Sequence, residues 1–329
     1  MTRVVRFHEL GGPEVLRIEK AEVRLPGPGE IRMAVKALGL NRAEALLRRG
    51  QYIETATLPS GLGFEAAGVV EAVGDGVDGF AIGDAVSVVP PLSQLRWPAY
   101  AELAVFPATL AVRHPAALDW ADAAASWMQY LTAWGALIDT ARLRRGDVVA
   151  ITAASSSTGL AAIQIANMVG ATPVAITRTH AKADALLKAG AAHVVASRDE
   201  DIAARLRAIA GADGVRVVFD PVAGPAFEPL AEAMARGGML IQYGALSPDP
   251  TPYPVYTALA KCLTLRGFLV HEVTGDPQRL AAGKAFVLDG LRSGALKPVI
   301  ARRFAFDDIV AAHRYLESNE QFGKVVVTL

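Results

Sequence analysis

The 329-residue sequence predicts an α/β protein that joins a doubly wound sheet of six parallel strands to a β-rich, partly barrel-like domain. The length exceeds the roughly 250–300 residues at which a single hydrophobic core stops growing, so two domains are expected. From residue 147 to 268, short β-branched runs alternate with alanine- and leucine-rich stretches, the pattern of βαβ units. Residues 1–120 instead combine short strand-like runs with turns rich in glycine and proline.

In the β-rich part, the strand-like runs cover residues 31–37, 66–72 and 85–89. The chain closes with Lys-Val-Val-Val-Thr-Leu at 324–329, a further strand that a six-stranded parallel sheet does not need. We therefore expect the end of the chain to return to the first domain.

Six strands and three clear helices are predicted in the alternating part. The helical stretches, 160–169, 182–189 and 201–210, are apolar at a spacing of 3.6 residues. Crossovers between successive strands predict a complete doubly wound sheet. The predicted strands are 147–152, 172–177, 193–196, 215–220, 239–243 and 263–268.

The composition narrows the class of function. Lys+Arg and Asp+Glu are balanced at 33 each, so no net charge attracts nucleic acid. The N-terminus lacks a signal-peptide core and no apolar run is long enough to span a bilayer, so we expect a soluble, cytoplasmic protein with no membrane partner. Cys262 is the only cysteine and is expected in the core, and the six histidines show no metal-binding spacing. No metal site is expected.

The stretch 148–166 is typical of a phosphate-binding turn. It combines a strand, a loop of small residues and a helix that begins near Gly159, so that free N–H groups and the helix dipole face an anion. Serines stand where two glycines are common in dinucleotide-binding turns. The residues predicted to hold a pyrophosphate are Ser155, Ser156, Ser157, Thr158 and Gly159.

Two other interpretations of this loop remain open. It can be an ordinary tight turn between a strand and a helix. It also resembles a G-x-S-x-G nucleophile elbow without its first glycine, in which Ser157 would be a hydrolase nucleophile with Asp220 and His271 as partners.

The end of the next strand favours NADP(H) over NAD(H). An NAD site places an acidic residue there for the ribose 2′-hydroxyl, whereas a 2′-phosphate requires cations. The sequence 175–182 contains no acid but offers Thr177, Arg178, Thr179 and Lys182. The alternative is that the two cations are only a solvated basic rim.

The whole chain resembles the zinc-free branch of the medium-chain dehydrogenase/reductase family, which includes quinone oxidoreductases and enoyl reductases. The matching stretches occur in family order: GGPEVL at 11–16, GLNRAE at 39–44, GLGFEAAGVV at 61–70, GDAV at 83–86, LTAW at 131–134, AASSSTGLAAIQ at 153–164 and GKVVV at 323–327. The resemblance implies a GroES-like catalytic domain (1–121), an NADP-binding Rossmann domain (122–268), and a connecting helix with a return to the catalytic domain (269–329). It also implies a homodimer formed through the sixth strand or its neighbours.

The resemblance further implies that zinc has no place in the reaction. Zinc-dependent relatives carry Cys, His and a further Cys or Asp at three positions where this chain has Asn41, Phe64 and Met128. None of these supplies the thiolate or imidazole that zinc prefers. The expected substrate is therefore an electrophile already activated by conjugation, a quinone or an α,β-unsaturated carbonyl, that receives hydride from NADPH.

Family positions also imply roles for individual residues. Tyr52 is the candidate proton donor, and Asn41 is expected beside the nicotinamide, hydrogen-bonded to the substrate carbonyl or to the cofactor ribose. A non-catalytic NADPH-binding role is the alternative function. The other residues expected at the cofactor are Thr132, Tyr243, Gly244, Ala245, Phe268, Leu269, Val270 and Lys324.

Overall fold

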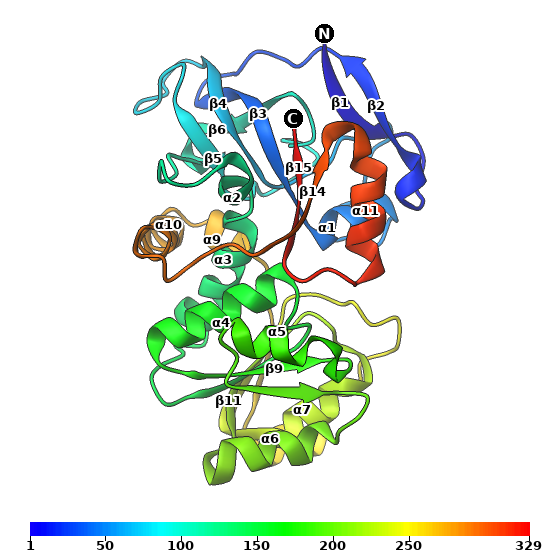
Figure 1. Cartoon of the computed structure of the whole chain (residues 1–329), viewed down its shortest axis with the longest axis vertical. Coiled ribbons are helices and arrows are strands. Elements are labelled where there is room, and N and C mark those ends of the chain that lie inside the picture. Colours follow the sequence, from blue (N-terminus) through cyan, green and yellow to red (C-terminus); the bar gives the residue numbers. More distant parts are fainter. The chain divides into compact units, whose positions relative to one another are not determined.

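A computed structural model describes all residues, 1–329, as two compact units (Figure 1). The first unit comprises Met1–Met128, Thr274–Arg292 and Lys297–Leu329, and the second comprises Gln129–Val273 and Ser293–Leu296. The domain limits placed after residues 121 and 268 stay a prediction. No helix combines the length and the apolar character that crossing a bilayer would require.

The second unit contains the predicted doubly wound sheet. Its six strands are all parallel and lie in the order β10-β9-β8-β11-β12-β13. The order starts in the middle and runs outward in both directions, so the strand order reverses between β8 and β11, the point where doubly wound folds bind ligands. The strands are β8 (Val148–Ile151), β9 (Thr172–Thr177), β10 (His193–Ala196), β11 (Val215–Asp220), β12 (Met234–Gln242) and β13 (Thr264–Gly267).

Helices cover both faces of this sheet (Figure 1). Helix α4 (Ser157–Val169) packs against β8 and β9, while α6 (Ile202–Ala210) and α7 (Phe227–Ala233) pack against the opposite face. Successive side chains along each strand point to opposite faces of the sheet, and helices bury both faces. The strands are therefore nearly continuous runs of apolar residues. The three predicted helices are confirmed, the second as α5 (Ala183–Lys188).

Cys262 is not a core residue, contrary to the expectation. It ends helix α8 (Val255–Lys261) in the left-handed conformation, with φ of 52°, and its side chain is exposed. The chain must turn sharply there to enter β13, and a residue at that turn projects toward solvent.

The first unit is built on a seven-stranded sheet with strand order β14-β15-β3-β4-β5-β7, in which β6 also pairs with β3. The predicted strands are confirmed as β3 (Glu30–Leu40), β4 (Ala66–Val73) and β5 (Ala85–Val88). The other strands of this unit are β1 (Thr2–Phe7), β2 (Leu16–Ala21), β6 (Leu103–Pro107), β7 (Ala111–Val112), β14 (Ile300–Ala305) and β15 (Lys324–Thr328).

The end of the chain returns to this sheet, as expected. Strand β15 runs antiparallel to β3, with Val325 opposite Leu40, and parallel to β14. Figure 1 shows β15 beside β3. This pairing brings Lys324 next to the carboxyl end of β3, where Asn41 follows.

Four helices complete the first unit. They are α1 (Arg42–Arg48), α2 (Trp120–Ala124), α10 (Pro277–Ser293) and α11 (Ile309–Ser318). Alanines of α2 pack on alanines of β3 and β4, which lets the helix approach the sheet closely. Helix α3 (Trp127–Ala133) continues directly into a π-helix, Trp134–Thr140, which precedes β8. A four-residue helix, α9 (His271–Thr274), follows β13.

Candidate active site

Asn41 sits where β3 ends and α1 begins, and its neighbours hold both of its amide hydrogens. It is the N-cap of α1, and its backbone N–H donates to Glu44 Oε2 at 2.6 Å, one half of a capping box. Its side-chain Nδ2 donates to the carbonyl of Gly39 at 3.0 Å and to Glu44 Oε1 at 3.1 Å. The residue is 9% exposed.

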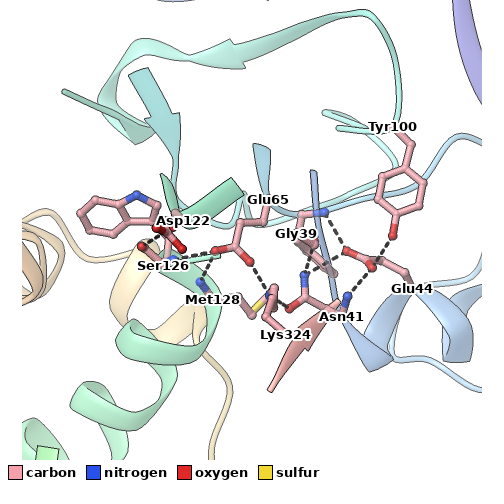
Figure 2. Close-up of polar contacts among 11 residues, drawn as sticks. Gly39, Asn41, Glu44, Glu65, Tyr100, Asp122, Ser126, Met128 and Lys324 are labelled. Carbon is pink, nitrogen blue, oxygen red and sulfur yellow. Dashed lines mark hydrogen bonds and ion pairs between the residues drawn. The ribbon is translucent and has the colours of Figure 1, made fainter. Parts of the chain in front are cut away.

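Lys324 provides the contact on the other side of the Asn41 amide (Figure 2). Its Nζ donates to Asn41 Oδ1 at 2.7 Å and to Glu65 Oε2 at 2.6 Å. The side chains of Lys324 and Glu65 are both 0% exposed. A buried ion pair of this kind is retained only where geometry and further hydrogen bonds compensate for lost hydration.

Glu65 connects this pair to the start of α3. Its Oε1 accepts from the backbone N–H groups of Trp127 at 2.6 Å and Met128 at 3.1 Å. The carboxylate therefore caps a helix N-terminus, where negative charge is favoured by the helix dipole. Figure 2 shows Glu65 between that helix and Lys324.

Glu44 extends the network toward the interior of the first unit. It accepts from the backbone N–H of Phe64 at 3.1 Å and from the Tyr100 hydroxyl at 2.7 Å. Burial raises the pKa of Glu44, and the hydrogen bonds it accepts oppose this. The Tyr100 oxygen also lies 3.3 Å from His313 Nε2, and burial lowers the pKa of His313 to about 3, so that ring is neutral.

Tyr52 lies in the loop after α1, half-buried against the ring of Phe64. The two rings meet edge to face, with centroids 6.2 Å apart. Burial, together with the charges of Glu54 and Glu44, raises the pKa of Tyr52. The phenol is therefore held in its protonated form, the form a proton donor requires.

In the second unit, the serine-rich loop forms a tight turn into α4. Ser156 is the N-cap, and its Oγ accepts from Gly159 N at 3.0 Å. A Cβ on Gly159 would lie 2.6 Å from the carbonyl oxygen of Ala154, so only glycine fits there. The turn thus presents the first N–H groups of a 13-residue helix on a loop of small side chains.

Both predicted cations lie in the segment that follows β9. Arg178 follows β9 and is exposed. Lys182, 27 residues after Ser155, brings its Nζ within 3.3 Å of the Ser155 Oγ. Thr177 ends β9 and Thr179 caps the short helix that follows. The structure thus joins the phosphate loop to the predicted 2′-phosphate residues.

The remaining predicted residues of the second unit follow β12 and β13, or lie in α3. The ring of Tyr243 stacks on Phe219 with centroids 4.0 Å apart, and burial raises the pKa of Tyr243 well above its usual value. Gly244 lies against Pro221, where an added Cβ would be 2.9 Å from the Pro221 carbonyl oxygen. The others are buried Thr132, Phe268 and Val270 and exposed Ala245 and Leu269.

Asp220 has a structural role that does not suit a catalytic triad. Its carboxylate accepts from the Thr152 hydroxyl and from the backbone N–H groups of Val222 at 2.9 Å and Ala223 at 2.8 Å. These bonds shape the loop after β11. Ser157 is the first residue of α4 and is not among the hydrogen-bond partners of the Asp220 carboxylate.

Sequence reasoning missed four buried residues of the first-unit network: Glu44, Glu65, Tyr100 and His313. Two of them had signals. Asn41 followed three residues later by Glu44 is a capping-box pattern, and Glu65 is a lone acid inside an apolar run. Tyr100 and His313 had none, because they meet only through the tertiary fold.

Two family models match the sequence. Residues 27–116 match the alcohol dehydrogenase GroES-like domain, and residues 157–282 match the zinc-binding dehydrogenase domain. Together they cover β3 to β7 of the first unit's sheet and β9 to β13 of the doubly wound sheet, while β8, β14 and β15 lie outside both matches.

Similar proteins extend over the whole chain. Quinone oxidoreductase 1 of Escherichia coli is 33% identical, with 98% of each chain covered, and a 2-haloacrylate reductase of a Burkholderia species is 30% identical, with 99% of each covered. A crystal structure of Escherichia coli quinone oxidoreductase complexed with NADPH superposes with a TM-score of 0.91 at 30% identity, covering 99% of this chain and all of that one.

Proposed function

The chain belongs to the medium-chain dehydrogenase/reductase family, and from that premise we propose that it is an NADPH-dependent reductase of quinones or of alkenes activated by a carbonyl, acting without zinc. One observation in the second unit carries the proposal. The turn of small residues before α4 lies beside the segment after β9, which contains cations and no acidic residue, and Lys182 of that segment contacts Ser155 of the turn. The names of two similar proteins, a quinone oxidoreductase and a 2-haloacrylate reductase, indicate substrates of this kind.

The second unit fits NADPH. Its phosphate turn suits a pyrophosphate, because Gly159 permits close approach and Ser156 fixes the helix start. Arg178 and Lys182 suit a 2′-phosphate, since a guanidinium and an ammonium can both donate to it. We assign the nicotinamide half to the ends of β12 and β13 and to Thr132, Asn41 and Lys324.

Zinc does not fit the first unit. At the three positions where zinc-dependent relatives carry ligands, Asn41 is held by hydrogen bonds to its neighbours, Phe64 is a buried ring, and Met128 has neither a thiolate nor an imidazole. A buried ammonium, Lys324, already bonds Asn41, and a second cation there would be repelled.

Without a Lewis acid, the protein must rely on alignment and on proton supply. When bound, NADPH provides the hydride that reduces the conjugated acceptor. The phosphate turn and the strand ends orient the bound molecules, and Tyr52 donates a proton to the reduced product from its hydroxyl. A phenol holds its proton throughout the neutral range even at its usual pKa, and the raised pKa of Tyr52 extends this to higher pH.

We also infer a homodimer built on β13. This strand forms one edge of the six-stranded sheet, and the neighbouring helix α8 exposes a cluster of large apolar side chains. Edge strands with apolar surroundings pair readily with a second copy. The exposed side chains are Val255, Tyr256 and Leu259 of α8 and Tyr253 just before it.

The test is anaerobic oxidation of NADPH and NADH, at equal concentrations, with 1,4-benzoquinone, an alkyl enone and a crotonyl thioester as parallel acceptors. We expect turnover with NADPH preferred, unchanged after dialysis against a chelator, and the best acceptor identifies the substrate class. Loss of turnover on chelation would contradict zinc independence. Binding of NADPH without turnover on any acceptor would favour the non-catalytic alternative.

A further inference from the structure

We propose that Lys324 is a positioning residue that locks the Asn41 side chain as a hydrogen-bond acceptor, so that Asn41 binds a donor group of NADPH and not the oxygen of the substrate. The inference rests on the proposed function, which assigns Asn41 to the nicotinamide half of the cofactor. It decides between the two partners, substrate carbonyl and cofactor, that the sequence left open for this residue.

A carboxamide can make only a fixed set of hydrogen bonds. An asparagine side chain has two N–H donors and one oxygen with two lone pairs. Both donors of Asn41 are used, by the Gly39 carbonyl at 3.0 Å and by Glu44 Oε1 at 3.1 Å. One lone pair of Oδ1 is used by Lys324 Nζ at 2.7 Å. A single acceptor position is left.

The opposite amide orientation is excluded by charge. Rotating the Asn41 amide by half a turn would place its NH₂ group against the ammonium of Lys324. It would also place its oxygen against the carboxylate of Glu44 and the carbonyl of Gly39. Each of these contacts would be repulsive in a buried site, so the amide has one orientation (Figure 2).

The chemistry of the ligand follows from this orientation. A quinone or enone oxygen is an acceptor and cannot use the remaining position on Oδ1. The nicotinamide half of NADPH offers two kinds of donor, the ribose hydroxyls and the carboxamide NH₂. The structure therefore directs Asn41 to the cofactor and leaves stabilisation of the substrate oxygen to other groups, of which Tyr52 is the candidate.

Lys324 is the element of this lock that can be tested. Replacing it alone would leave the Glu65 carboxylate buried and uncompensated, and such a variant can fail to fold. A neutral pair, Lys324→Met with Glu65→Gln, removes both charges together while keeping similar volumes. The amide introduced by Glu65→Gln retains an oxygen for the N–H groups of Trp127 and Met128. The matched control is Lys284→Met, which removes a half-buried lysine that bonds only backbone carbonyls of the same unit.

The experiment measures the Kd of NADPH by its fluorescence, and kcat and KM for a quinone, in a double-mutant cycle with Asn41→Ala. Loss of one hydrogen bond predicts a Kd raised about tenfold for Asn41→Ala. We expect a similar rise for the neutral pair, no further rise when the two are combined, and no change for Lys284→Met. A raised KM for the quinone with an unchanged Kd for NADPH would overturn the inference, because it would place Asn41 on the substrate.

Two further outcomes separate the inference from the function it rests on. If Asn41→Ala weakens NADPH binding but the neutral pair does not, or if the two effects simply add, the positioning role of Lys324 is wrong and the proposed function stands. If Asn41→Ala changes neither binding nor turnover, the assignment of Asn41 in the proposed function itself fails.

A cofactor analogue identifies the donor. The reduced 3-acetylpyridine analogue of NADP carries an acetyl group in place of the carboxamide and so lacks its NH₂ donor. If Asn41→Ala weakens NADPH binding but not binding of the analogue, the carboxamide is the partner. If it weakens both equally, the ribose hydroxyl is.

Discussion

The hydrogen-bonded residues Lys324, Asn41, Glu65 and Glu44, here called the Lys324 network, need a glycine at position 39. A Cβ at this position would lie 2.2 Å from the carbonyl oxygen of Ala124, 2.8 Å from Lys324 Cε and 2.9 Å from Glu65 Oε2. We expect Gly39→Ala to lower the free energy of unfolding by about 2 kcal/mol or more, the range of overpacked cores, and to weaken NADPH binding. Urea unfolding measures the first effect. Gly267→Ala, whose added Cβ meets nothing within 4 Å, is the control for the unfolding measurement, and an equal loss of stability in both variants would contradict this prediction.

His313 gives the first unit a dependence on pH. Its folded pKa is about 3 against 6.5 for the free side chain, because the ring is buried beside Arg48 and Arg42. Below pH 6.5 the unfolded chain binds a proton that the folded chain does not, so stability falls as pH falls from 6.5 toward 3. A variant without this group, His313→Gln, escapes that loss.

The measurement is urea unfolding of wild type and His313→Gln at pH 7 and pH 5. At about 1.36 kcal/mol per pKa unit, the wild type should lose about 2 kcal/mol more than the variant between these pH values. A difference in stability that does not change with pH would show that His313 binds a proton as readily in the folded state as in the unfolded chain.

At the scale of elements, the start of α4 should combine stability with cofactor binding. Ser156→Ala removes the hydroxyl that accepts from Gly159 N, and the loss of an N-cap costs about 1 kcal/mol. Asp201 caps α6 in the same manner, accepting from Ala204 N at 2.9 Å, at a distance in sequence from the phosphate turn. We expect Ser156→Ala and Asp201→Ala to destabilise the protein similarly, while only Ser156→Ala raises the KM for NADPH. Equal KM values in the two variants would remove α4 from the cofactor site.

The elements themselves were largely predictable, because their signals are local. The strands of the second unit are β-branched runs separated by amphipathic helices, and the predicted β8 through β11 agree with the structure to within one residue at each end. Strand β12 begins at Met234, earlier than predicted, because its first residue pairs with Val215 across a register shift that no local pattern reveals. The Lys324 network was not predictable as a unit, since Asn41 and Lys324 meet only when the last strand pairs with β3.

At the scale of the whole molecule, the apolar surface of α8 predicts association. Tyr256 is 87% exposed and Leu259 is 71% exposed, beside a sheet edge, β13, that has no strand partner on its outer side within the chain. A second copy paired through β13 would cover both features in a symmetric interface, in which each patch meets its own image. Light scattering after size exclusion should give twice the chain mass for the wild type and the single-chain mass for Leu259→Glu with Tyr256→Glu. Leu187→Glu, which places one such charge on the exposed side of α5, should leave the dimer intact. A wild-type protein that is monomeric at every concentration tested would remove the dimer from the proposal while leaving the assignment of the cofactor site untouched.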